Sequence, residues 1–253
     1  MKRNLILSLR YDGSAFHGWQ FQPNCITVEE EMKKACKRIL GEDVRLQSCS
    51  RTDAGVHANM FCCSFKTESQ RDCEKLITGL NAVLPETISV FSCKEVSEDF
   101  HARYSCVGKE YIYKIWNGKQ RNPFLTKYAL NYPHEIDCEM LDLQARQFIG
   151  TFDFASFCAS GSSVLSTVRT IYDCRVWREG ETVVFSIKGN GFLYNMVRII
   201  VGTLLDINRG KIEKDKISEI IASKNREAAG VTVGPEGLYL NKVYYSEEEI
   251  LNG

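Results

Sequence analysis

A short polar stretch at residues 50–58, Ser-Arg-Thr-Asp-Ala-Gly-Val-His-Ala, is dense in groups that can do chemistry. It holds the guanidinium of Arg51, the hydroxyl of Thr52, the carboxylate of Asp53 and the imidazole of His57. A positioned carboxylate can act as a nucleophile or a general base. An isolated Asp-Ala-Gly more often makes a turn, because an Asp side chain bonds nearby backbone amides. A fold alone does not need all four groups together, so the stretch indicates a reaction or a ligand.

A second charged residue, Arg198, lies inside the apolar stretch 192–201. On a helix its neighbours at spacing four are Tyr194 and Gly202, so no carboxylate at that spacing pairs with it. An unpaired buried charge is costly, so the guanidinium either meets a carboxylate from elsewhere or reaches water along the apolar surface. Asp53 is a natural partner, because a neighbouring guanidinium lowers the pKa of a carboxylate and keeps it ionised. The sequence leaves both alternatives open.

The segment 99–128 interleaves basic and aromatic residues, a combination that suits phosphate contact and base stacking. Its basic residues are Arg103, Lys109, Lys114, Lys119, Arg121 and Lys127, and its aromatic residues include Tyr104, Tyr111, Tyr113, Trp116 and Phe124. Residues 109–115 also alternate as a strand with one buried and one solvated face does, and both interpretations can hold for one strand. The formal net charge of the chain is zero, so an RNA partner needs a local basic patch of this kind.

The elements that must position these residues fall into two halves. In the first half we predict a strand, a helix opened by a Thr27–Glu30 capping box, two strands flanking the 50–58 loop, a second helix and a fourth strand. The predicted ranges are 5–9, 28–40, 44–48, 61–65, 71–83 and 88–96. This order is the ferredoxin-like pattern of a largely antiparallel sheet with helices on one face.

The second half repeats the mixture of strands and helices without a clean sequence repeat. Residues 150–157 and 161–163 are predicted to be mobile loops, and a hairpin is predicted around Glu179-Gly180. The other predicted ranges are a helix at 137–150, hairpin strands at 168–177 and 182–188, helices at 192–206 and 212–223, and a final strand at 238–245. We therefore expect two α/β domains, residues 1–105 with the Asp53 loop and residues 106–253 with the Tyr111 strand and the Arg198 helix.

Composition narrows the class of protein further. Hydrophobic residues make up 44% of the 253 residues, which is typical of a globular protein. The 11 cysteines are scattered, and no cysteine or histidine pair has metal-ligand spacing. His57 is therefore expected to be a structural hydrogen-bond partner with no role in proton transfer. No signal segment or membrane span is predicted, so we expect a cytoplasmic protein with reduced thiols.

The run 51–58 resembles the signature loop of the tRNA pseudouridine synthase A family. Four further stretches are similar to motifs of that family and follow in the family's order, together with the pair Tyr111-x-Tyr113. The four stretches are 11–20, 99–103, 191–202 and 236–240. These similarities extend over nearly the whole chain, so the chain is identified as resembling this family.

The resemblance implies a function, a fold and a role for each matched residue. Asp53 would be the catalytic aspartate, Tyr111 would stack on the target base, Arg198 would form an ion pair with Asp53, and Arg51 would contact RNA and help to extrude the nucleotide. The reaction would isomerise uridine to pseudouridine at positions 38, 39 and 40 of the tRNA anticodon stem-loop, without a cofactor or a metal. The protein would be a homodimer, and two ferredoxin-like subdomains would form a pseudouridine synthase core around a central cleft.

Two residues depart from the family pattern, and two other functions compete with this one. Ser50 stands where glycine is common, and Phe61 replaces a common glutamine, which predicts the loss of a polar group near the site. The first competing function is a non-catalytic RNA-binding protein on the same scaffold. The second is a glycoside hydrolase, which needs a second carboxylate beside Asp53 that the loop does not offer.

Overall fold

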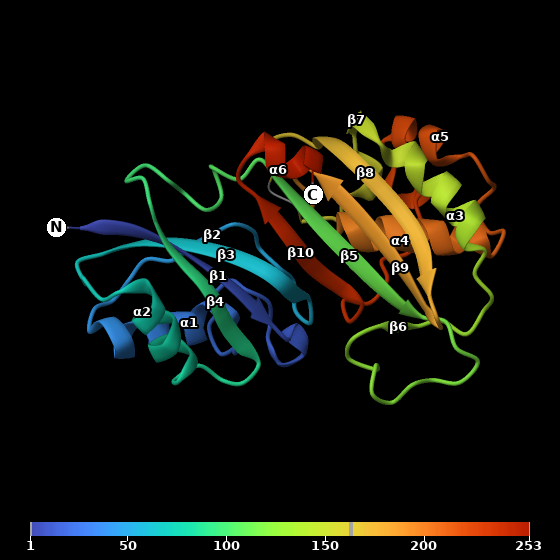
Figure 1. Ribbon diagram of the computed structural model, residues 1–253. Helices are drawn as coiled ribbons and strands as arrows, with labels where there is room; N and C mark the ends of the chain where they lie inside the picture. The colour runs from blue at the N-terminus through green and yellow to red at the C-terminus, as the bar shows by residue number, and fades with distance from the viewer. Residues whose placement is uncertain (1, 162–163, 253) are drawn as a thin grey trace. The chain divides into compact units, whose positions relative to one another are not determined.

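The computed structural model describes residues 2–161 and 164–252, which divide into two compact units. The first unit holds the chain up to residue 107 together with the residues from 239 onward, and the second unit holds the chain between them. Each unit combines helices with a mostly antiparallel sheet (Figure 1), so the predicted α+β class is confirmed. No helix within the described part of the chain is long and apolar enough to cross a membrane.

The first unit is built on a sheet in which β1 lies between β3 and β4. The elements of this unit are β1 (Arg3–Tyr11), the 3-10 helix η1 (Gly13–Ala15), α1 (Val28–Leu40), β2 (Gln47–Ser48), β3 (His57–Thr67), α2 (Cys73–Asn81), β4 (Ile88–Val96), β10 (Leu238–Tyr244) and α6 (Glu247–Asn252). β3 also pairs antiparallel with β2 and parallel with β10, where Tyr239 lies beside His57. The C-terminal strand therefore supports the start of β3, directly after the 50–58 loop.

α1 and α2 lie together on one face of this sheet (Figure 1). α1 begins where the sequence predicts, because the Thr27 hydroxyl accepts a hydrogen bond from the Glu30 amide at 3.4 Å. Alternate residues of β1, Leu5, Leu7 and Leu9, point to one side of the strand and are fully buried. Their apolar side chains form the centre of the core of this unit.

The second unit holds a sheet in the order β5-β9-β8-β7, with β6 parallel to β5. Its elements are β5 (Gly108–Trp116), β6 (Leu130–Asn131), α3 (Cys138–Ala145), the 3-10 helix η2 (Arg146–Phe148), β7 (Gly150–Asp153), the 3-10 helix η3 (Ala155–Phe157), β8 (Val168–Glu179), β9 (Thr182–Gly189), α4 (Met196–Asn208), α5 (Ile217–Ser223) and the 3-10 helix η4 (Arg226–Ala228). The predicted hairpin is confirmed by β8 and β9, which are joined at Gly180 with φ 61°. α4 is buried on nearly all sides, as its apolar composition predicts.

Several predicted boundaries are wrong for identifiable reasons. The segment 150–157 is not a mobile loop, because β7 pairs with β8 and the side chains of Phe154 and Phe157 are fully buried. α4 starts at Met196 and not at residue 192, since Asn195 has a left-handed backbone with φ 59°. The predicted strand at 44–48 shortens to β2. Residues 162 and 163, predicted as part of a second mobile loop, lie outside the described residues.

Candidate active site

Asp53 lies in a tight turn between β2 and β3 in the first unit. The Val56 amide donates a hydrogen bond to the Asp53 carbonyl at 3.2 Å, and Gly55 takes φ 78°, a conformation that glycine adopts without strain. The turn chemistry expected for Asp-Ala-Gly is therefore present, but it uses the Asp53 backbone. The Asp53 side chain is half-buried and that of Arg51 is exposed, so both lie where a ligand can reach them.

The residue before Asp53 is held by the N-terminal motif 11–20. The Tyr11 and Thr52 hydroxyls share a hydrogen bond of 2.8 Å, and both side chains are buried. The Trp19 amide donates a second hydrogen bond, of 3.2 Å, to the Thr52 carbonyl. These two contacts fix the backbone on one side of the carboxylate. No local pattern in the sequence predicts them.

Two glycines allow the N-terminal motif to approach the loop so closely. A Cβ added at Gly18 would overlap with the Thr52 carbonyl oxygen, and one added at Gly13 would overlap with the Val56 carbonyl oxygen. Gly18 also has φ 83°, which disfavours any other L-residue. The motif therefore works as a close-fitting support for the loop that carries Asp53.

His57 has the structural hydrogen-bonding role that the sequence predicts. Its side chain is buried, its Nδ1 accepts a hydrogen bond from the Gly13 amide at 3.0 Å, and its ring stacks on Tyr239 at 4.6 Å. Nδ1 also lies 3.3 Å from Asp12 Oδ1. This contact is an ion pair only when the imidazole is protonated.

Phe61 lies in the core of the first unit, against the N-terminal motif 11–20. Its side chain is fully buried in the first unit, stacks on Trp19 at 4.1 Å and meets Tyr11 at 5.7 Å. The expected loss of a polar group near the site, and its effect on which tRNAs are used, stay predictions. Phe61 packs beneath Trp19 and Tyr11, the two residues that hold Thr52.

Tyr111 lies on β5 in the second unit, opposite Ile187 of β9. Its side chain is buried, and its ring meets the edge of Phe192 at a centroid distance of 5.0 Å and an angle of 82°. Such edge-to-face contacts favour one orientation of the ring. The contact with Phe192 therefore favours one orientation of the Tyr111 ring.

Arg198 is anchored by two hydrogen bonds within the second unit. Its Nε donates to the Val233 carbonyl at 2.7 Å, and its Nη1 donates to Asn195 Oδ1 at 2.9 Å. Asn195 precedes Arg198 by three residues, a spacing at which helical side chains meet. Asn195 was not predicted as a partner from spacing four, whereas the spacing of three indicates it.

Tyr113 is influenced by the charges of both Glu236 and Arg198 in the second unit. The Tyr113 hydroxyl donates to the Gly234 carbonyl at 2.7 Å. Burial raises the pKa of Tyr113 strongly, the Glu236 carboxylate raises it further, and the Arg198 guanidinium opposes these effects. Tyr113 therefore remains a protonated donor at neutral pH.

The predicted site residues are thus divided between the units. Arg51 and Asp53 share the loop of the first unit, whereas Tyr111 and Arg198 belong to the second. The ion pair between Asp53 and Arg198 stays a prediction.

A cavity of about 940 Å³ in the second unit lies elsewhere. It is lined by residues such as Asp137, Asp142, Trp177 and Arg178, and by none of the four predicted site residues. Its acidic lining suits neither a phosphate nor a nucleic acid. Across the described residues, no group of three His, Cys, Asp or Glu side chains is arranged to hold a metal ion.

Comparisons with known proteins identify the family. The chain matches the family described as "tRNA pseudouridine synthase" over residues 8–105 and 144–246. It is 46% identical over 243 residues to the tRNA pseudouridine synthase A of Thermoanaerobacter sp. (strain X514), covering 96% of this chain and 100% of the relative. Identity to the tRNA pseudouridine synthase A of Caldicellulosiruptor saccharolyticus is 47%, with the same coverage. A solved structure described as a Cbf5-Nop10-Gar1 complex gives a TM-score of 0.33 at 12% identity, covering 78% of this chain and 52% of that chain, and is too distant to support an argument.

The chain therefore belongs to the tRNA pseudouridine synthase A family, as its motifs predict. The predicted enzyme class, an isomerase that makes pseudouridine in tRNA, is confirmed with it. The glycoside hydrolase is excluded by the same finding.

Proposed function

We propose that the protein isomerises uridine to pseudouridine at positions 38, 39 and 40 of the tRNA anticodon stem-loop, with Asp53 as the catalytic residue. One observation carries this proposal: the signature loop is intact in a chain that matches a tRNA pseudouridine synthase A over that relative's whole length. In the reaction the N-glycosidic bond breaks, the base turns over and a carbon–carbon bond forms. An ionised carboxylate suits a nucleophile or a base in such a sequence.

The geometry around Asp53 supports this assignment. Its carboxylate is half-buried at the tip of a turn, while the preceding residue, Thr52, is fixed by Tyr11 and Trp19. A rigid backbone holds a reacting group in place and avoids the entropic cost of positioning it during the reaction. Asp53 is thus both accessible and pre-organised.

Arg198 is proposed to form an ion pair with Asp53 and to keep it ionised. Its bonds to Val233 and Asn195 fix the plane of the guanidinium. A fixed planar guanidinium matches the geometry of a carboxylate better than a mobile ammonium does. This pairing assigns a role to the one basic residue of α4.

Tyr111 and Arg51 are proposed to bind the substrate. The rigid ring of Tyr111 would stack on the target uracil, and the exposed guanidinium of Arg51 would contact the RNA backbone and help to extrude the nucleotide. Taking a base out of its stack costs a few kcal/mol, which such contacts offset.

The remaining expectations concern architecture and assembly. We propose that residues 1–105 and 106–253 act as two ferredoxin-like subdomains, that the protein works as a cytoplasmic homodimer, and that it needs neither a cofactor nor a metal. A dimer would bring together two sets of local basic residues, which matters for a chain whose formal net charge is zero.

A direct test is to incubate the protein with an unmodified anticodon-arm tRNA in buffer with chelator and no cofactor, and then to map pseudouridines by carbodiimide adducts and primer extension. We expect modification at positions 38, 39 and 40, and none in a matched tRNA with cytidine at those positions. Binding of the tRNA without any pseudouridine would favour the non-catalytic RNA-binding protein. Modification only at other positions would refute the proposed substrate site.

A further inference from the structure

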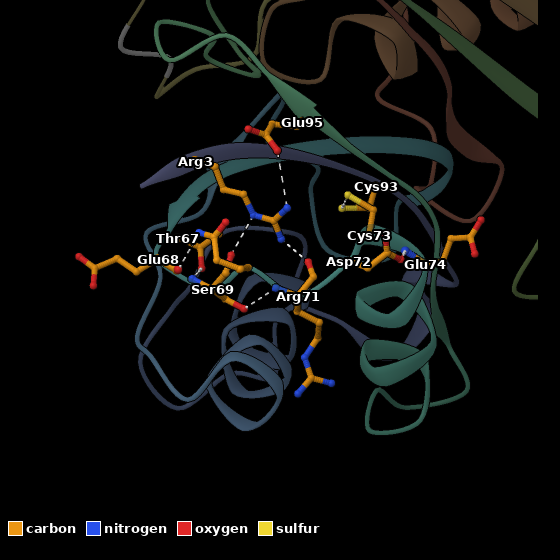
Figure 2. A network of polar contacts seen from close by, with 11 residues as sticks. Arg3, Thr67, Glu68, Ser69, Arg71, Asp72, Cys73, Glu74, Cys93 and Glu95 are labelled. Carbon is orange, nitrogen blue, oxygen red and sulfur yellow. Dashed lines mark hydrogen bonds and ion pairs between the residues drawn. The ribbon is translucent and has the colours of Figure 1, made fainter. Parts of the chain in front are cut away.

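Two thiols meet in the first unit, and neither belongs to the residues assigned to catalysis. Cys73 is the first residue of α2 and Cys93 lies on β4, and their Sγ atoms are 3.0 Å apart (Figure 2). A disulfide bond is about 2.05 Å long, so roughly 1 Å of approach separates this pair from a covalent link. Cys93 is buried and Cys73 is partly exposed.

The helix that carries Cys73 is fixed to β4 at its other end as well. Asn81, the last residue of α2, donates from Nδ2 to the Val90 carbonyl at 2.7 Å, and its Oδ1 accepts from the Val90 amide at 2.8 Å. Asp72 caps the first turn, because its Oδ1 accepts from the Glu74 amide at 2.8 Å. The thiol contact is therefore held by the surrounding structure and does not depend on a mobile segment.

Arg3 fixes the chain that leads into α2. Its Nε donates to the Ser69 carbonyl at 2.8 Å, and its Nη2 donates to the Arg71 carbonyl. Its Nη1 lies 3.6 Å from Glu95 Oε2 on β4 (Figure 2). One side chain of β1 thus ties the start of α2 to β4 and keeps Cys73 opposite its partner.

The two sulfur atoms differ in accessibility and in chemical state. Burial raises the pKa of the Cys93 thiol, and its contact with Cys73 raises it further, so Cys93 is protonated at neutral pH. Cys73 is the more exposed residue of the two. A partly exposed cysteine beside a second, resolving cysteine is the arrangement found in thiols that respond to peroxide.

We propose that Cys73 and Cys93 form a peroxide-reactive dithiol that closes to a disulfide. Hydrogen peroxide first oxidises Cys73: the O–O bond breaks, an S–O bond forms to give a sulfenic acid, and one water leaves. The Cys93 sulfur then attacks the Cys73 sulfur, the S–O bond breaks, and the Cys93 proton leaves with the hydroxide as a second water. Two thiols are oxidised and one hydrogen peroxide is reduced to two waters.

The disulfide would join residues 20 positions apart and attach α2 to β4 covalently. A closed loop of this length restricts the unfolded chain, and we expect the midpoint of thermal unfolding to rise by roughly 5–10 °C. This inference does not depend on the proposed function, because it concerns only the stability and the oxidation state of the first unit.

The test uses the reduced full-length protein, treated with one equivalent of hydrogen peroxide, alkylated with N-ethylmaleimide and digested for mass spectrometry. We expect a Cys73–Cys93 linked peptide, the loss of two of the 11 thiols, and reversal of both by dithiothreitol. The midpoint of thermal unfolding should rise with the link and fall again on reduction. An oxidised protein without this peptide, or one in which other cysteines are linked, would overturn the proposal.

Three variants test which cysteines form the link. Cys25→Ser removes another partly exposed cysteine of the first unit and should leave the link unchanged. Cys73→Ser should abolish it. Cys93→Ser should also abolish it and leave a Cys73 sulfenic acid that dimedone traps. Loss of two thiols in Cys93→Ser would contradict the assignment of Cys93 as the resolving cysteine. If a variant fails to fold, the presence or absence of the Cys73–Cys93 peptide in the oxidised wild type tests the proposal.

Discussion

The bond between Tyr11 and Thr52 gives the sharpest test of how the catalytic loop is held. Tyr11→Phe removes one hydroxyl from a buried pair at 2.8 Å and leaves the Thr52 hydroxyl without this partner. A buried polar group that loses its partner costs about 1–3 kcal/mol, whereas removing both partners costs much less. Thr52→Val should therefore destabilise the protein as Tyr11→Phe does, and the double variant should recover most of the loss.

The same bond positions the residue before Asp53, so it should affect turnover as well as stability. Small misplacements of a reacting group lower rates by about 10- to 100-fold, and we expect kcat to fall in this range with KM for tRNA nearly unchanged. The assay combines urea unfolding with initial rates on unmodified tRNA for the wild type, both single variants and the double variant. Additive losses of stability, or a wild-type kcat in Tyr11→Phe, would refute the reasoning.

Three further predictions address other residues. Tyr111→Phe keeps the ring that packs on Phe192, so the Kd for tRNA should stay unchanged while kcat falls. An unchanged kcat would show that the hydroxyl has no role in turnover. Arg198→Lys loses the two anchoring bonds and should cost about 1–3 kcal/mol in urea unfolding and most of the activity, and full activity would contradict the proposed ion pair. Burial raises the pKa of Cys36 to about 12 and of Cys62 to about 11, so unfolding releases protons at alkaline pH. The free energy of unfolding should therefore fall as pH rises above about 8.5. The fall should be steeper in the wild type than in Cys36→Ala. A free energy of unfolding that stays constant between about pH 8 and 10 would contradict this prediction.

The parts of the fold that were predictable carry local signals. β4 spans Ile88–Val96, the residues predicted from its apolar pattern between turn residues. The start of α1 followed from the Thr27 cap, and the β8–β9 hairpin followed from Glu179-Gly180. In each case a residue at the boundary decides the structure through its own backbone preference or side-chain bond.

The parts that were missed depend on distant or conformational information. The pairing of β10 with β3 joins Tyr239 to His57, and no local pattern reveals such a partner. The delayed start of α4 depends on the left-handed backbone of Asn195, which its apolar surroundings hide. The stacking of Phe61 on Trp19 also joins segments that are distant in the sequence, so no local pattern predicts it.

One part of the candidate site could be predicted from the sequence, and another part could not. The charged and polar residues around Asp53 indicate a functional loop from the sequence alone. The support that Tyr11 and Trp19 give to Thr52 could not be predicted, because it joins segments about 40 residues apart through one hydroxyl pair and one amide.

One measurement tests the central claim most directly: pseudouridine formation by Asp53→Asn beside the wild type and a matched control, Asp43→Asn. Asp43 is an exposed acid of the same unit, so its substitution controls for the loss of one negative charge. The account predicts that Asp53→Asn makes no pseudouridine while its Kd for tRNA stays within about twofold, a difference of roughly 0.4 kcal/mol, and that Asp43→Asn behaves as the wild type. Pseudouridine formed by Asp53→Asn at the wild-type rate would contradict it.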